Sequence, residues 1–139
     1  MDVVLNEVRE YLSKIPYINE GGCGIAAISM YRWLLENEED SKLICFYNEF
    51  ENYDLNKKNM IYTYPYLLSP NHCGIIYQNK ILDSEEEINK NYYPYHQNLN
   101  EIELLKIINL SNWNPNFERK NINKIEKGLQ INLSDIYKF

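Results

Sequence analysis

Residues 23–35 constrain the fold most, because they are apolar on nearly every face of the helix that they predict. Such a helix is buried on all sides, since contact between apolar surface and water is unfavourable. The rest of the chain must therefore surround it. With 139 residues, 45% of them apolar, the chain has enough material for one core, and we expect a single domain over residues 1–139.

Segments before and after this central helix predict another helix and several short strands. Asp2 can cap an amphipathic helix that ends by Pro16. Residues 42–47 and 60–68 have the apolar and aromatic content of strands, and residues 73–83 that of a hairpin. We therefore expect an α+β fold in which the central helix packs on an antiparallel sheet.

The C-terminal part of the chain predicts two additional helices and a last strand. Asn100 and Glu103 have the spacing of a capping pair for the first helix. A second helix would start at residues 114–115 and be closed by Gly128. Residues 129–137 are expected to form the strand, and His96 is expected to lie in a loop.

Charge and sequence ends exclude several classes of partner. The net charge is −6, from 20 acidic against 14 basic residues, which disfavours nucleic acid and anionic membrane surfaces. The chain has neither the basic and apolar regions of a signal peptide nor an apolar run of membrane-spanning length. We expect a cytoplasmic protein whose three cysteines are reduced thiols.

Cys23 has the sequence position of a nucleophile. A thiol in the first turn of a helix faces unpaired backbone N–H groups and the positive end of the helix dipole, and both favour the thiolate. The neighbouring glycines Gly21, Gly22 and Gly24 allow a sharp turn and the close approach of a substrate backbone. This combination predicts a catalytic cysteine more strongly than a structural one.

His72 and Asp83 are the expected partners of Cys23. If Gln78 and Asn79 form a two-residue turn, residues 72, 74 and 76 share a face with residues 81 and 83. Asp83 then lies diagonally from His72, across from Gly74, which has no side chain to block it. The carboxylate would orient the imidazole, and the imidazole would exchange a proton with Cys23.

An oxyanion hole requires hydrogen-bond donors close to the nucleophile. The backbone N–H of Cys23 is the first candidate, and Asn19 or, less favourably, Tyr17 would supplement it from the preceding loop. Gly22 belongs to the same expected substrate-binding segment.

Cys45 and Cys73 are more simply explained as small core residues, with Cys73 facing away from His72 along the strand. A zinc site from Cys23, His72 and Cys73 is disfavoured because neighbouring strand residues point to opposite faces and no CxxC spacing exists. We expect neither a metal nor another cofactor.

Two segments carry a resemblance to a known superfamily: residues 19–27 (NEGGCGIAA) and 72–85 (HCGIIYQNKILDSE). Together they resemble papain-like and transglutaminase-like cysteine peptidases in their short bacterial and phage forms. The resemblance covers about residues 17–85 and implies a papain-like fold, a Cys-His-Asp triad, and attack on an amide, isopeptide or ester carbonyl. Tyr17 stands where papain relatives often have a glutamine.

Two functions follow as hypotheses. The first is a cysteine peptidase or amidase acting on a peptide or protein substrate through an acyl-enzyme on Cys23, with acyl transfer to an amine as a variant. The second is a catalytically inactive binding protein, for example a viral one, that uses a papain-like scaffold for protein–protein interaction.

Overall fold

The structure is a computed structural model that describes residues 2–18, 22–47, 71–93, 95–110 and 119–136. The expected strand at residues 60–68 lies outside these ranges. The described elements confirm an α+β fold, in which four α-helices accompany one antiparallel sheet. In chain order the elements are α1 (Asp2–Ser13), α2 (Cys23–Glu36), β1 (Lys42–Tyr47), β2 (His72–Tyr77), β3 (Lys80–Leu82), the short 3-10 helix η1 (Lys90–Tyr92), β4 (Tyr95–Leu99), α4 (Glu101–Leu110) and α5 (Arg119–Leu129).

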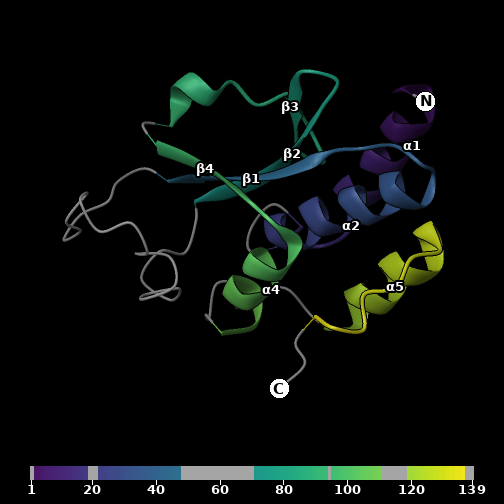
Figure 1. Cartoon of the computed structure of the whole chain (residues 1–139). Coiled ribbons are helices and arrows are strands. Elements are labelled where there is room, and N and C mark those ends of the chain that lie inside the picture. The colour runs from purple at the N-terminus through teal and green to yellow at the C-terminus, as the bar shows by residue number, and fades with distance from the viewer. Residues whose placement is uncertain (1, 19–21, 48–70, 94, 111–118, 137–139) are drawn as a thin grey trace.

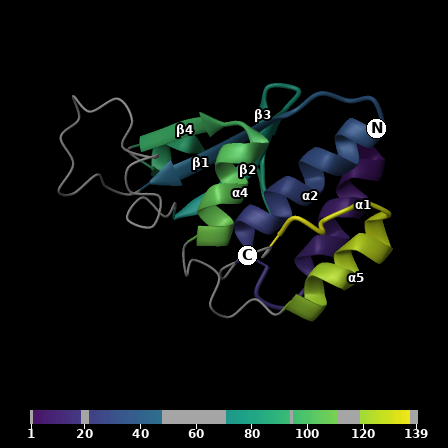
Figure 2. The ribbon, with the colours of Figure 1, turned by 60° about the horizontal axis from the view of Figure 1, so that its bottom comes forward.

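The sheet has the strand order β3-β2-β1-β4, so the two longest strands lie at its centre. The helices lie on one side of it, and η1 with its flanking segments lies on the other (Figure 1). Figure 2, turned by 60°, shows α2 between the sheet and the pair α1 and α5. The central place of α2 thus agrees with the sequence prediction.

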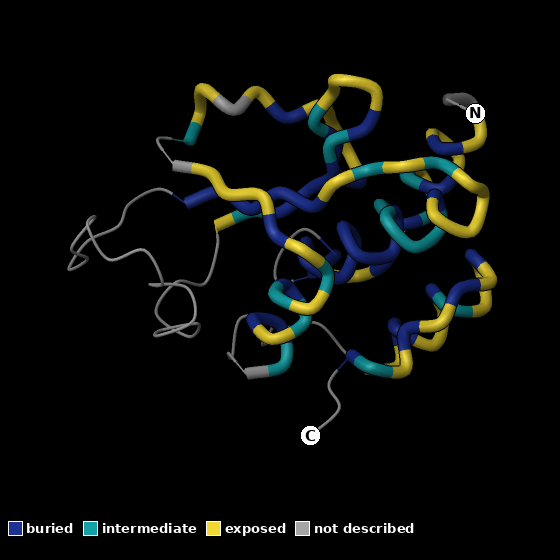
Figure 3. Tube along the Cα trace, viewed as in Figure 1, coloured by how far each residue is buried: buried dark blue, intermediate teal, exposed yellow. Residues whose placement is uncertain are grey.

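Burial follows this layering. Almost every residue of α2 from Cys23 to Met30 is fully enclosed, and β1 and β2 are largely buried (Figure 3). Leu35 at the end of α2 is 54% exposed, so the buried part of the helix stops short of the predicted end. A second, smaller apolar cluster covers the opposite face of the sheet and contains Ile44, Phe46 and Ile88. Burial of apolar surface on both faces stabilises the two central strands.

Two local predictions are confirmed by backbone geometry. Gln78 and Asn79 both have positive φ angles, 51° and 64°, as a two-residue hairpin turn requires, and Tyr77 pairs with Lys80. At the start of α4 the Glu103 N–H donates to the Asn100 side chain, and the Asn100 N–H donates to the Glu103 carboxylate. This reciprocal pair is a capping box.

Gly128 was wrongly expected to close the last helix. It lies inside α5, where a Cβ atom would collide with the ring of Tyr11 from α1, so glycine permits close helix packing there. The left-handed residue that follows the helix is Gln130, with a φ of 56°.

The tail and His96 also differ from expectation. Residues 131–136 form turns instead of a strand, with Ile131, Leu133 and Ile136 buried in the helical core. The Leu133 N–H bonds to the Glu126 carboxylate and not to a sheet. His96 is in strand β4 opposite Phe46, because pairing with β1 extends the backbone that the local sequence suggested was a loop. Among helices of the described ranges, none has the length and apolar character to cross a bilayer.

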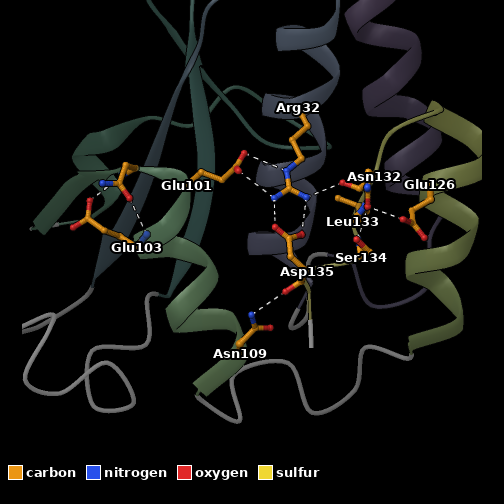
Figure 4. Close-up of polar contacts among 10 residues, drawn as sticks. Arg32, Glu101, Glu103, Asn109, Glu126, Asn132, Leu133, Ser134 and Asp135 are labelled. Atoms are coloured by element: carbon orange, nitrogen blue, oxygen red, sulfur yellow. Dashed lines mark hydrogen bonds and ion pairs between the residues drawn. The ribbon is translucent and has the colours of Figure 1, made fainter. Parts of the chain in front are cut away.

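Arg32 joins α2 to α4 and to the C-terminal segment (Figure 4). Its guanidinium donates two hydrogen bonds to Asp135, two to Glu101 and one to the Asn132 carbonyl, at 2.6–3.2 Å. Burial opposes the charge, but the hydrogen bonds to Asp135 and Glu101 outweigh it and raise the pKa of Arg32. One cation thus fixes three segments that are distant in sequence.

We expect Arg32→Ala to lower the free energy of unfolding by about 2–4 kcal/mol, because it leaves two carboxylates and a carbonyl without their donor. Urea denaturation followed by circular dichroism measures this. Glu10→Gln is the matched control: it breaks the Lys14–Glu10 pair, whose side chains are 73% and 70% exposed, and little change is expected. Equal effects of the two substitutions would contradict a structural role for Arg32.

Candidate functional site

Cys23 is the first residue of α2, as the sequence predicted. The first helical hydrogen bond runs from the Ala26 N–H to the Gly22 carbonyl, so the helix offers no acceptor to the N–H groups of the three residues before Ala26. These N–H groups and the helix dipole favour negative charge at the Cys23 sulfur. The side chain is buried, with 4% of the residue exposed.

Two described residues before Cys23, Tyr17 and Gly22, are joined by a hydrogen bond. Tyr17 has a φ of 62°, and its carbonyl accepts a hydrogen bond of 3.0 Å from the Gly22 N–H. The Gly22 N–H is therefore already used, while the Tyr17 side chain is 49% exposed. Asn19, the other expected oxyanion donor, lies outside the described residues. The Cys23 N–H is thus the best-placed oxyanion donor among the described residues.

His72 and Asp83 meet as the hairpin register requires. Ile75 pairs with Leu82 and Ile76 with Ile81, which places residue 83 on the same face as residue 72. The His72 Nε2 lies 2.7 Å from Asp83 Oδ2, and both side chains are largely buried. The hydrogen bond fixes the orientation of the imidazole.

Asp83 is held as a carboxylate by its own loop. Its Oδ1 accepts hydrogen bonds from the backbone N–H groups of Glu85 and Glu86, at 2.7 and 2.6 Å. Burial favours the protonated acid, but the bond to His72 and these two N–H donors outweigh it, so the pKa of Asp83 lies below its usual value. The carboxylate is therefore available to stabilise a positive imidazole.

Cys23 lies close enough to His72 for each group to shift the pKa of the other. Because Asp83 occupies Nε2, Nδ1 is the ring nitrogen that remains for another partner. Burial disfavours a charged His72, yet the interactions with Asp83 and Cys23 outweigh it and raise its pKa to about 10. The structure thus joins His72 to Asp83 by a hydrogen bond and places Cys23 beside them.

The thiol of Cys23 is correspondingly acidic. A hydrogen bond from the Cys73 thiol is the largest cause; burial opposes it, and His72 adds a hydrogen bond and a positive charge. Together these interactions lower the pKa of Cys23 from the ordinary 9.0 to about 6. The lowered pKa of Cys23 and the raised pKa of His72 both favour a thiolate beside an imidazolium at neutral pH.

Gly74 allows the close approach of β2 and β3. The sequence suggested only that its missing side chain leaves room for the Asp83 carboxylate. A Cβ atom at residue 74 would lie 2.6 Å from the backbone oxygen of Leu82 and 3.0 Å from Ile88 Cδ1. The missing side chain therefore lets the backbone at the end of β3 approach β2, which carries Asp83 towards His72.

Three residues near the site were not identified as parts of it from the sequence. Arg9 of α1 donates a 2.7 Å hydrogen bond to the Asp83 carbonyl, which anchors the Asp83 loop to a helix. Tyr93 packs on Phe46 with ring centroids 4.9 Å apart; burial first, then the charges of Asp83 and Cys23, raise its pKa. Cys73 is buried as expected, but its thiol also lies close enough to Cys23 to lower the pKa of that thiol.

No local pattern marks these contacts, because all three join segments distant in sequence. Within the described ranges, no group of three or more histidine, cysteine or acidic side chains has an arrangement suited to a metal ion. The titratable side chains that the site brings together are the thiol of Cys23, the imidazole of His72 and the carboxylate of Asp83.

We expect alkylation of Cys23 by iodoacetamide to follow a pH profile with a midpoint near 6, because only the thiolate reacts and its pKa is lowered. His72→Ala removes a hydrogen bond and a positive charge, so the midpoint should rise towards the ordinary 9.0. Mass spectrometry of the tryptic peptide 15–32 measures the rate. Glu10→Gln, at an exposed position of α1, is the control with an unchanged midpoint. A wild-type midpoint near 9 would refute the ion pair.

Gly74→Ala should destabilise the protein by about 1–3 kcal/mol, because the new methyl group forces β2 and β3 apart. It should also raise the midpoint of Cys23 alkylation, since His72 loses the alignment that Asp83 gives it. Urea denaturation and the same alkylation assay test both effects. A variant with wild-type stability would show that the strands adjust to the methyl group without strain.

The chain was compared with protein-family models, curated proteins and solved structures. No family model matches it, and neither search found a matching curated protein or solved structure. Its own residues therefore carry the functional inference.

Proposed function

We propose that this protein is a thiol hydrolase, a cysteine peptidase or amidase of the papain-like kind, that cleaves an amide, isopeptide or ester bond through an acyl-enzyme on Cys23. The observation that carries the proposal is the hydrogen-bonded pair His72 and Asp83 beside Cys23 at the start of α2. The papain-like assignment is supported by α2, which starts at the cysteine and packs on β2, the strand that starts at the histidine.

In the first half of the reaction the Cys23 thiolate attacks the substrate carbonyl carbon. The negative charge that develops on the carbonyl oxygen is stabilised by the Cys23 backbone N–H and the helix dipole. The His72 imidazolium gives its proton to the leaving nitrogen or oxygen, the carbonyl carbon–leaving group bond breaks, and a thioester remains on Cys23.

In the second half His72, now neutral, accepts a proton from water as the water oxygen attacks the thioester. The carbon–sulfur bond breaks and Cys23 leaves as a thiolate beside the restored imidazolium. Asp83 stabilises the imidazolium and keeps the ring aligned. An amine in place of water would complete an acyl transfer by the same steps.

Several features distinguish this proposal from an inactive scaffold. A buried core cysteine needs no ion-pair partner, because burial by itself favours the neutral thiol. Here a histidine, oriented by a carboxylate, and a second thiol overcome that burial. Strongly shifted pKa values with specific charged partners are typical of functional sites.

We expect p-nitrophenyl acetate to acetylate Cys23 and the acetyl-enzyme to turn over, with a rate that rises near pH 6 and falls near pH 10. The rise reports formation of the thiolate, and the fall reports loss of the imidazolium proton. Nitrophenolate release measures turnover, and the mass of peptide 15–32 measures the acetyl group. Amide and isopeptide libraries then identify the substrate.

Matched variants separate catalysis from simple thiol reactivity. Cys23→Ser should abolish the acetylated peptide, and His72→Ala should slow hydrolysis of the thioester by about 100-fold or more. Asp83→Asn should slow it by about 10-fold or more while the fold remains intact. An acetyl-Cys23 that hydrolyses no faster in the wild type than in His72→Ala would favour the inactive binding protein.

A further inference from the structure

All three cysteines of this chain gather at one place in the core. Cys45 on β1 and Cys73 on β2 are directly opposite each other, and their Sγ atoms are 3.0 Å apart. Cys23, at the start of α2, belongs to the same buried cluster and interacts electrostatically with Cys73. Cys73 therefore lies between the other two cysteines, and all three are free thiols.

This arrangement exceeds what thioester chemistry requires. In the acyl-enzyme reaction Cys23 alone forms a covalent bond, Cys73 does no more than favour its thiolate, and Cys45 has no part. Cysteine is not needed to fill the position of Cys45, since alanine or serine has similar size. Thiols in contact with a reactive thiolate have a chemistry of their own, because a thiol can condense with an oxidised cysteine to form a disulfide.

We propose that the three cysteines form a thiol relay that rescues Cys23 from oxidation by hydroperoxides, with Cys73 as the resolving cysteine and Cys45 as the final partner. The relay requires Cys23 to be a thiolate but does not require the hydrolase activity. Its end product is a Cys45–Cys73 disulfide and a reduced Cys23.

The first step is attack of the Cys23 thiolate on hydrogen peroxide. A sulfur–oxygen bond forms, the oxygen–oxygen bond breaks, and the released hydroxide takes the His72 proton to become water. In the second step the Cys73 sulfur attacks the Cys23 sulfenic acid. The Cys23–Cys73 disulfide forms, and the hydroxyl group leaves as water with the Cys73 proton.

The third step is thiol–disulfide exchange. The Cys45 sulfur attacks Cys73, the Cys45–Cys73 bond forms, and Cys23 leaves as a thiolate while the Cys45 proton passes to His72. A thiolate stabilised by an imidazolium is a good leaving group, which directs the exchange towards release of Cys23. In sum, one peroxide and the thiols of Cys45 and Cys73 become one disulfide and two waters.

The strand geometry accommodates the final bond. Directly opposite residues on neighbouring antiparallel strands have Cα atoms about 4.5–5.5 Å apart, within the range that disulfides span. Cys45 and Cys73 are such a pair, both 0–1% exposed, so bulk reductants reach the product slowly. Hydrogen peroxide is small enough to enter a site where Cys23 is only 4% exposed.

The full-length protein tests the relay because trypsin places the cysteines in three different peptides: 15–32 with Cys23, 43–57 with Cys45, and 59–80 with Cys73. The protein is treated with one equivalent of hydrogen peroxide, quenched over time with N-ethylmaleimide, digested and analysed by mass spectrometry. We expect a 15–32/59–80 disulfide first, and then a 43–57/59–80 disulfide with alkylated Cys23.

Two variants isolate the steps. Cys45→Ser should stop at the 15–32/59–80 disulfide. Cys73→Ala should form no internal disulfide. It also removes the thiol that lowers the pKa of Cys23, so sulfinic acid formation is compared at about pH 10, where Cys23 is ionised in both proteins. There the variant should accumulate Cys23 sulfinic acid about tenfold faster than the wild type under excess peroxide. The wild-type time course tests the proposal even if a variant does not fold.

Three outcomes would overturn the relay: a Cys23 that peroxide does not oxidise, wild-type sulfinic acid formation as fast as in Cys73→Ala, or disulfides only between molecules. The relay and the hydrolase are also separable. If the protein forms the Cys45–Cys73 disulfide but hydrolyses no thioester, the relay stands and the hydrolase proposal falls. If it hydrolyses the thioester but forms no such disulfide, the hydrolase proposal stands and the relay falls.

Discussion

The burial of α2 is the constraint on which the rest of this structure depends. The helix has no polar face over its first two turns, so the sheet must cover one side and α1, α4 and α5 the others. That enclosure places the first residue of the helix, Cys23, inside the protein beside β2. The positive end of the helix dipole then favours negative charge at the start of the helix.

The same enclosure creates an electrostatic problem that the site solves locally. A buried thiol and a buried imidazole would both prefer to be neutral, because a dry environment does not solvate charge. Each instead has partners that favour its charged form: Cys73 and His72 for the thiolate, Asp83 and Cys23 for the imidazolium. Asp83 is in turn held by two backbone N–H groups. The charges are therefore mutually dependent: the charged form of each group is stabilised by the group next to it.

Patterns confined to one element were predictable from the sequence. The central helix, the two-residue turn at Gln78 and Asn79, and the capping box at Asn100 and Glu103 depend on neighbours within a few residues. The turn then fixed the strand register, and the register paired His72 with Asp83. Local rules failed at the tail and at Gly128, where packing against distant helices decided the conformation.

The sequence by itself determined which residue begins the buried helix and which two residues share a face of the hairpin, because helical period and strand alternation are local properties of the chain. Only the tertiary structure decided that Cys73 lies beside Cys23, with its Sγ 3.0 Å from that of Cys45. The same holds for the support of the Asp83 loop by Arg9 and for the three segments that Arg32 links. These contacts join residues far apart in sequence, and their partners are chosen by the packing of α2 against the sheet and the other helices.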